Sequence, residues 1–194
     1  MADDGAVIGA VLDGDVDRYA ELVTAYQAQA RRLAFSLLGS EEDAKDASQE
    51  AFVSAYRSLR RFRRGAKFST WLYRIVVNAC RDVSRRRVRH AGWVTVGGSE
   101  AAMDGVGLFE DVEDPAAPPN EQAASREMAQ RLSDAIGALP MKQRTAFVLH
   151  HLHGVPLKEI ADVMRCRLGT VKSHVFRATE HLRERLSPCL EGHD

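Results

Sequence analysis

Apolar residues recur at helical spacing along most of the chain. Between Val155 and Leu186 the pattern predicts two helices joined by a tight turn. The second helix carries one continuous apolar stripe, made of Leu168, Val171, Val175, Ala178, Leu182 and Leu186. A short helix packed across a second helix with a basic, hydrogen-bonding outer face is the helix-turn-helix arrangement, which suits the DNA major groove. The alternative is an amphipathic hairpin whose charges only face solvent.

Three longer helices are predicted in the first half of the chain. The first runs from Val16 to Leu38, after the N-cap Asp15 and before Gly39, which closes it. The next opens with a capping box at Ser40 and runs to about Arg60. The third starts near Ser69 and ends in a run of arginines. No strand pattern is evident, so this half is predicted to be a helical bundle.

The composition changes in the middle of the chain. Residues 91–120 are rich in glycine, proline and acidic residues and show no sustained periodicity, which is typical of a linker. Helical periodicity returns near Glu121. We therefore predict an all-α protein with two small helical domains, residues 1–90 and 121–190, joined by a flexible acidic linker.

Charge is balanced overall but unevenly distributed. The chain has 27 Lys and Arg and 27 Asp and Glu, and the basic residues cluster at 57–67, 81–90 and 172–185. Segregated charge can present strongly basic faces to nucleic acid even in a neutral protein. The three cysteines are widely spaced, which fits a reducing compartment. With an acidic N-terminus and no long apolar run, we expect a cytoplasmic protein without a membrane span.

Two stretches carry a family resemblance. The first, DASQEAFVSAYRSLRRFR followed by FSTWLYRIVVNACRDVSRRR, resembles the second conserved region of extracytoplasmic-function (ECF) sigma factors of the sigma-70 family. The second, ALPMKQRTAFVLHHLHGVPLKEIADVM with LGTVKSHVFRATEHLRERL, resembles their fourth region. The resemblance implies a promoter-specificity subunit that binds core RNA polymerase, with region 2 in residues 1–90 and region 4 in residues 121–190.

In such proteins region 4 reads the minus-35 element as duplex. Carried over by position, the reading residues are Lys172, Ser173, Phe176 and Arg177, with Thr170, His174 and Arg167 beside them. Arginine can donate two parallel hydrogen bonds to guanine, and phenylalanine can lie against a thymine methyl. The chain departs from the family pattern at Arg165 and Arg167 in the turn, and at His174, where arginine is common.

Region 2 would open and hold the minus-10 element. The resemblance assigns Trp71, Tyr73 and Asn78 to base contacts, although Trp71 also lies on the apolar stripe; we expect Tyr73 and Asn78 nearer the polar side. An extruded base costs a few kcal/mol in stacking, which a pocket that stacks and hydrogen-bonds it can restore. The residues expected to follow the phosphate backbone are Arg63, Arg64, Arg81, Arg85, Arg86 and Arg87.

The resemblance also implies partners. The acidic face with Asp43, Asp46, Gln49 and Glu50 is similar to the surface that docks on the clamp coiled coil of the polymerase's largest subunit, and the flap would meet region 4. The simpler interpretation is a solvated acidic helix face. The linker would thread the active-site cleft, or serve as a passive tether. An anti-sigma factor is expected to hold the protein inactive.

Other constellations suggest different functions. The histidines at 150, 151 and 153 lack a fourth ligand at convincing spacing, so we expect surface histidines and no metal site. The chain has no phosphate-binding loop and no nucleophile elbow, and we expect neither a cofactor nor catalysis. The alternatives are a stand-alone helix-turn-helix regulator and a metal- or redox-sensing protein built on the histidines and Cys166.

Overall fold

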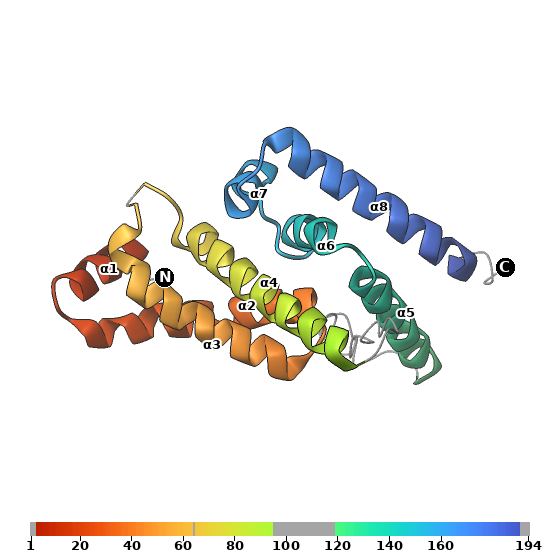
Figure 1. The fold of residues 1–194 in the computed structure, drawn as a ribbon, viewed down its shortest axis with the longest axis horizontal. Coiled ribbons are helices and arrows are strands. Elements are labelled where there is room, and N and C mark those ends of the chain that lie inside the picture. Colours follow the sequence, from red (N-terminus) through yellow and green to blue (C-terminus); the bar gives the residue numbers. More distant parts are fainter. Residues whose placement is uncertain (1–2, 64, 95–118, 191–194) are drawn as a thin grey trace.

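The computed structural model describes residues 3–63, 65–94 and 119–190. Every regular element in these ranges is a helix, so the all-α prediction is confirmed for the described residues (Figure 1). The α-helices are α1 (Asp4–Leu12), α2 (Tyr19–Leu38), α3 (Glu41–Ser58), α4 (Phe68–Val94), α5 (Pro119–Gly137), α6 (Met141–Phe147), α7 (Leu157–Met164) and α8 (Leu168–Leu190). Two 3₁₀ turns (Val16–Arg18 and Leu59–Arg61) and one π-helical turn, η5 (Val148–Leu152), complete them.

Helices α2, α3 and α4 pack closely because the inner face of α3 is lined with small side chains. Ala44, Ala47, Ala51 and Ala55 are all fully buried, and small contact residues allow helix axes to approach. The connection between α2 and α3 follows the predicted chemistry. Gly39 takes a left-handed conformation (φ 68°), and the Ser40 hydroxyl accepts a hydrogen bond from the Asp43 amide at 3.3 Å.

One additional helix and two helix boundaries differ from prediction. Helix α1 was not anticipated: its two glycines and lack of a polar face conceal it, and burial of Val7, Ile8 and Val11 holds it in place. Asp15 precedes a 3₁₀ turn without capping it by its side chain, so α2 begins only at Tyr19. Helix α4 continues to Val94, past the expected boundary at residue 90.

Helices α1–α4 form the first unit, and α5–α8 with η5 form the second. In the second unit, α7 lies across α8 as a helix-turn-helix. Arg165 ends α7 in a left-handed conformation (φ 52°), and the Cys166 amide then donates to the Ala161 carbonyl at 3.1 Å. Val171, Ala178 and Leu182 of α8 are buried against this unit, as their spacing predicts. The rest of the linker prediction, residues 95–118, lies outside the described residues.

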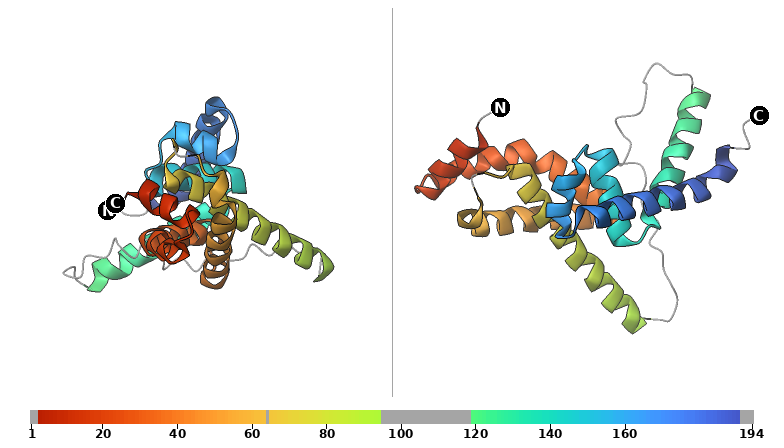
Figure 2. Two further views of the ribbon diagram at one scale, coloured as in Figure 1. Left: turned by 90° about the vertical axis from the view of Figure 1, so that its left-hand side faces the viewer. Right: turned by 90° about the horizontal axis from the view of Figure 1, so that it is seen from above.

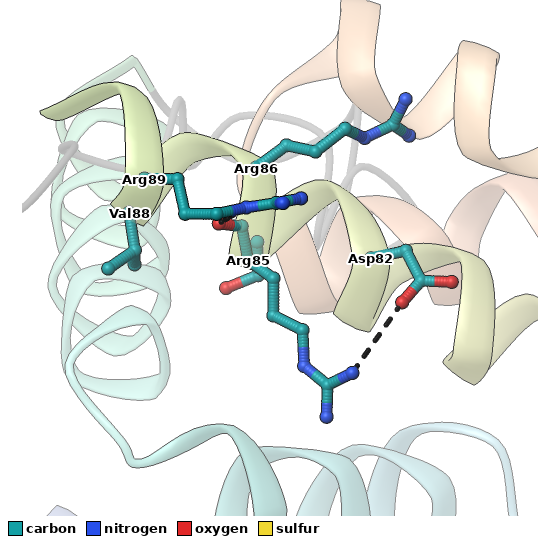
Figure 3. Close-up of a pocket in the computed structure, with 6 residues that line it drawn as sticks. Asp82, Arg85, Arg86, Val88 and Arg89 are labelled. Carbon is teal, nitrogen blue, oxygen red and sulfur yellow. Dashed lines mark hydrogen bonds and ion pairs between the residues drawn. The ribbon is translucent and has the colours of Figure 1, made fainter.

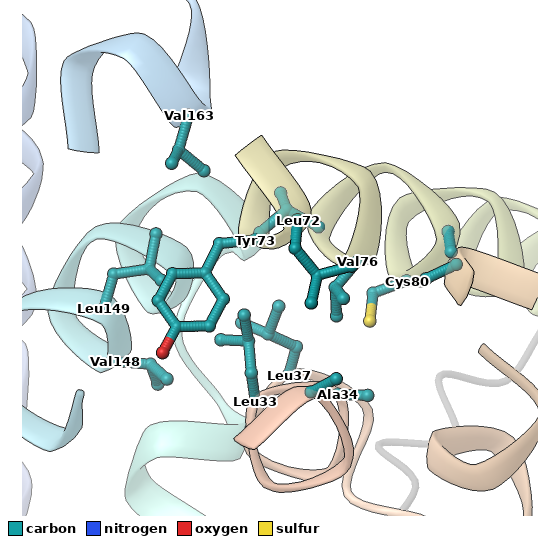
Figure 4. Packing of buried hydrophobic residues seen from close by; sticks show 14 of the residues in the cluster. Leu33, Ala34, Leu37, Leu72, Tyr73, Val76, Cys80, Val148, Leu149 and Val163 are labelled. Atoms are coloured by element: carbon teal, nitrogen blue, oxygen red, sulfur yellow. The ribbon is translucent and has the colours of Figure 1, made fainter. Parts of the chain in front are cut away.

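The two units are in direct contact through an apolar interface. Val148 and Leu149 of η5 and Val163 of α7 meet Leu33, Leu37 and Tyr73 from α2 and α4 (Figure 4). Figure 2 shows from two further directions that α6 and α7 lie against α2 and α4. One continuous hydrophobic cluster therefore spans both units. No helix within the described ranges is long and apolar enough to cross a membrane.

Candidate nucleic-acid interface

The outer face of α8 is open. Phe176 is 66% exposed, although it is a large aromatic residue, and the apolar stripe of α8 is complete without it. The residues exposed with it are Thr170, Lys172, Ser173 and Arg177, and Arg167 is exposed in the turn just before the helix. An exposed aromatic ring among hydrogen-bonding and cationic side chains offers contacts to base methyls, base edges and phosphates.

The protein constrains two residues of this face, one by a hydrogen bond and the other by burial. The Ser173 hydroxyl donates to the Gly169 carbonyl at 3.0 Å, which leaves its oxygen lone pairs to accept a hydrogen bond from a base amino group. His174 is half-buried, and burial, together with the charges of Lys142 and Arg177, lowers its pKa. It is therefore neutral at pH 7 and cannot replace the arginine that the family pattern favours there.

The α7–α8 turn keeps its shape without glycine. Arg165 occupies the left-handed region, which disfavours residues with a Cβ. Arg165 and Arg167 are both exposed on either side of Cys166, which is half-buried. The departures from the family pattern thus add two accessible cations beside the recognition helix and leave the helix-turn-helix intact.

The aromatic residues of α4 lie differently. Trp71 is 8% exposed and packs edge-on against Phe62 and at a tilt against Phe68, with ring centroids 5.4 and 5.7 Å away. Tyr73 is also 8% exposed, which corrects the expected position on the polar side. Its hydroxyl donates to Gln29 at 3.3 Å, and its ring meets that of His153 at 5.8 Å. The α6–α7 segment of the second unit covers Tyr73. The spacing of residues along α4 alone cannot reveal this contact.

Farther along α4, polar residues are accessible. Asn78, Arg85 and Arg86 are exposed, as is Arg63 before the helix, whereas Arg81 is half-buried and burial lowers its pKa. Arg64 lies outside the described residues. The C-terminal half of α4 projects from the packed helices (Figure 2). There, Arg85, Arg86 and Arg89 surround a shallow pocket with Asp82, Ser84 and Val88 (Figure 3).

The acidic face of α3 meets the basic face of α4. Asp46, Gln49 and Glu50 are exposed, but Asp43 is half-buried and forms an ion pair with Arg87. Glu50 lies 3.6 Å from Arg86. Residues predicted for polymerase docking and residues predicted for phosphate contact are thus neighbours along one edge of the bundle.

Polar contacts between the units involve residues that no site prediction included. The Glu159 carboxylate of α7 accepts hydrogen bonds from the Lys67 ammonium and the Thr70 hydroxyl, each at 2.6 Å. These two donors lower the pKa of Glu159. Arg144 of α6 donates to the Leu37 carbonyl in the last turn of α2 at 2.7 Å. The basic cluster that contains Lys67 was visible in the sequence, but its partner was not.

One histidine of the cluster, His153, lies at the interface between the units. His153 is half-buried against Tyr73, and burial followed by the charge of Arg32 lowers its pKa to about 4. The expected surface position is thus wrong for His153 and for the half-buried His150, whereas His151 is exposed as expected. His150 lies 3.3 Å from the Val155 carbonyl, and its ring packs edge-on to that of His151 at 4.8 Å. Among the described residues, no three His, Cys, Asp or Glu side chains are grouped so as to hold a metal ion.

Both units of the chain match known protein families. The family model for sigma-70 region 2 matches residues 22–90, and that for sigma-70 region 4 matches residues 129–182. The chain is 35% identical over 190 residues to the RNA polymerase sigma-H factor of Pseudomonas aeruginosa, covering 96% of this chain and 95% of that protein. It is 32% identical over 176 residues to the ECF RNA polymerase sigma factor SigW of Bacillus subtilis (strain 168), covering 91% and 92%.

Two solved complexes have a similar fold. The sigma factor RpoE in complex with the anti-sigma factor NepR from Bartonella quintana is 27% identical with a TM-score of 0.64, covering 87% of this chain and 96% of that one. CnrH, in complex with the cytosolic domain of CnrY, is 22% identical with a TM-score of 0.64, covering 98% and 99%. With the two matched regions and relatives above 30% identity over nearly the whole length, the chain belongs to the extracytoplasmic-function family of RNA polymerase sigma factors, the promoter-specificity subunits of the polymerase.

Proposed function

We propose that helix α8 reads the minus-35 element through Lys172, Ser173, Phe176 and Arg177. The single observation that carries this proposal is the open, basic and aromatic outer face of α8, which lies opposite the buried Val171, Ala178 and Leu182. Arg177 supplies paired donors for guanine, and Lys172 and Arg167 neutralise phosphates. Thr170 and the neutral His174 lie at the edge of this contact.

Region 2 is proposed to hold the melted minus-10 strand along α4. Asn78 is exposed and can pair with a base edge, and the arginines of the projecting half of α4 supply phosphate contacts. The buried position of Trp71 favours a positioning role, in which it packs the start of α4 against Phe62 and Phe68. Tyr73 can contact DNA only when the α6–α7 unit moves away from it.

Docking on core polymerase is assigned to the exposed residues of α3. Asp46, Gln49 and Glu50 form an accessible acidic surface suited to a basic partner, and Asp43 supports it through Arg87. The expected partner is the clamp coiled coil of the largest subunit, with the flap meeting region 4. The chain supplies recognition in the cytoplasm, and the polymerase carries out the chemistry.

Control by an anti-sigma factor is the remaining part of the proposal. A relative of the same fold, RpoE of Bartonella quintana, is known in complex with the anti-sigma factor NepR. The exposed apolar side chains of this chain include Val53 and Tyr56 of α3. Such residues beside the acidic docking surface would let one protein compete with the polymerase for the same face.

The test is run-off transcription from a promoter library with purified core polymerase, with and without this protein. We expect new start sites only in its presence, with a common upstream sequence and a common minus-10 sequence. Arg177→Ala should relax the upstream preference, whereas Arg183→Ala, on the same helix but paired locally with Glu180 at 2.7 Å, should leave it intact. Binding to a duplex operator without any effect on core polymerase would instead support a stand-alone regulator.

A further inference from the structure

The first turn of α4 is occupied by a carboxylate from the other unit. Lys67 immediately precedes Phe68, the first residue of α4, and Thr70 lies in its first turn. Both donate to the same side chain, Glu159, each at 2.6 Å. An ammonium and a hydroxyl thus converge on one anion beside the N-terminal end of a 27-residue helix, the end at which negative charge is favoured.

We propose that Lys67, Thr70 and the first turn of α4 form a binding site for a backbone phosphate of the melted promoter strand, and that Glu159 occupies this site as an internal substitute. A carboxylate and a phosphate present the same kind of anionic oxygen acceptors to these donors. This inference rests on the proposed function, because the competing ligand is promoter DNA.

The same contact covers the neighbouring aromatic residue. Tyr73 lies one turn beyond Thr70 and is buried by His153 and by η5. The Lys67 side chain is exposed even in the closed form, so separation of the units would free its ammonium and the Thr70 hydroxyl from Glu159 and would uncover the Tyr73 ring. These are the groups that bind one phosphate and stack one base of a single strand.

The closed arrangement also bears on how the two promoter elements are read. Under the proposed function, α8 reads one stretch of the promoter as duplex and α4 holds a separate stretch as a melted strand. In the closed protein, α7, which packs directly on the recognition helix α8, is hydrogen-bonded to the start of α4. Glu159 consequently stabilises a form that can use α8 but not the first turn of α4.

The first experiment tests closure without DNA. Glu159→Gln keeps the size of the side chain and removes its charge, and amide hydrogen exchange of residues 68–77 in the free protein reports opening. We expect exchange to become roughly two- to fivefold faster, the range for a partly exposed charged pair. Glu127→Gln, whose partner Arg131 lies one turn away on the same helix, is the matched control and should leave exchange unchanged. Equal exchange in the Glu159→Gln protein and wild type would overturn the proposal.

A charge exchange separates closure from DNA binding. Lys67→Glu alone should open the units and weaken binding of the holoenzyme to a promoter with a melted minus-10 segment. Adding Glu159→Lys should restore protection from exchange but not DNA binding, because position 67 would still repel phosphate. Recovery of both properties, or of neither, would contradict the proposal.

The phosphate contact has its own readout. In saturated holoenzyme, Lys67→Gln should reduce the slope of log affinity against log salt by about 0.7, the value for one phosphate on single-stranded DNA. An unchanged slope with faster exchange in Glu159→Gln would show a closing contact without a phosphate site and would overturn the inference. If the wild-type holoenzyme selects no promoter at all, the proposed function fails instead, and the exchange data still report on closure.

Discussion

The two surfaces expected to face DNA use similar residues but differ in accessibility. On α8, Phe176 stands in solvent between Lys172, Ser173 and Arg177. On α4, Trp71 and Tyr73 are buried, and Lys67 and Thr70 are bound by Glu159. The recognition helix is thus ready for duplex DNA, whereas the start of α4 first requires a movement of the other unit. The burial of the aromatic rings and the engagement of Lys67 and Thr70 by Glu159, rather than residue type, distinguish the two surfaces.

The largest expected difference between the two surfaces is in stability. Trp71→Ala should lower the free energy of unfolding by about 3–5 kcal/mol, because it leaves a cavity beside Phe62 and Phe68. Phe176→Ala should change it by less than about 0.5 kcal/mol, since the ring is mostly exposed. Urea denaturation of both proteins measures the difference. Similar losses would show that Phe176 also packs in a core, and Trp71→Phe should recover most of the stability.

The next effect concerns Arg144, which makes one of the polar contacts between the units. Arg144→Ala should destabilise the protein by about 2 kcal/mol, because its guanidinium donates to three backbone carbonyls, those of Leu37, Gly137 and Leu139. Its pKa is lowered by burial, so these acceptors replace water around a desolvated charge. Thermal unfolding measures the loss, with exposed Arg183→Ala as the control. Similar melting curves for the two variants would show that the contacts of Arg144 do not stabilise the protein.

Base reading by α8 should give an effect of similar or smaller size. Arg177→Ala is expected to reduce discrimination at one minus-35 position by about 1–3 kcal/mol, which corresponds to one bidentate contact to guanine. Competitive binding of single-base promoter variants to the holoenzyme measures it. A uniform loss across all variants would instead assign Arg177 to a phosphate. Either result leaves the open character of the α8 surface in place.

The smallest predicted effect is a gain in stability. Arg165→Gly should stabilise the protein by about 1 kcal/mol, because glycine adopts the left-handed conformation of this turn without the Cβ penalty. Arg167→Gly serves as its control. Because Arg167 does not have a positive φ, glycine there makes the unfolded backbone more flexible without relieving strain in the folded turn, and no gain in stability is expected. Calorimetry compares the two proteins. If both variants lose stability, the turn depends on contacts of the arginine side chains.

Local patterns were sufficient to predict most helices. The alanine face of α3, the stripe of α8 and the end of α2 at Gly39 all follow from spacing and from capping chemistry that acts within a few residues. Helix α1 escaped prediction because its apolar residues, interrupted by Gly5 and Gly9, mark no single face. Its helical state depends on burial against the bundle, to which propensity contributes little.

The residues of the candidate sites also divide into those whose exposure the sequence predicts and those whose contacts it does not. Exposure of Lys172, Phe176 and Arg177 could be inferred because an amphipathic helix buries only one stripe. The burial of Tyr73, the pairing of Asp43 with Arg87 and the capture of Lys67 and Thr70 by Glu159 could not be inferred, since each depends on a partner from another helix. Glu159 and Thr70 are 89 residues apart, and no periodicity connects them.

Residue order along the chain accounts for the helices, their inner faces and the chemistry that each outer face can offer, because these depend on neighbours three or four positions away. The tertiary structure decides which outer faces reach solvent. Packing of α6, η5 and α7 on α2 and α4 covers Tyr73 and brings Glu159 onto Lys67 and Thr70, whereas the outer face of α8 stays exposed. Which face is covered depends on an apolar interface between segments that are distant in the sequence. The pattern of a single segment cannot predict this interface, because the buried area comes from both sides.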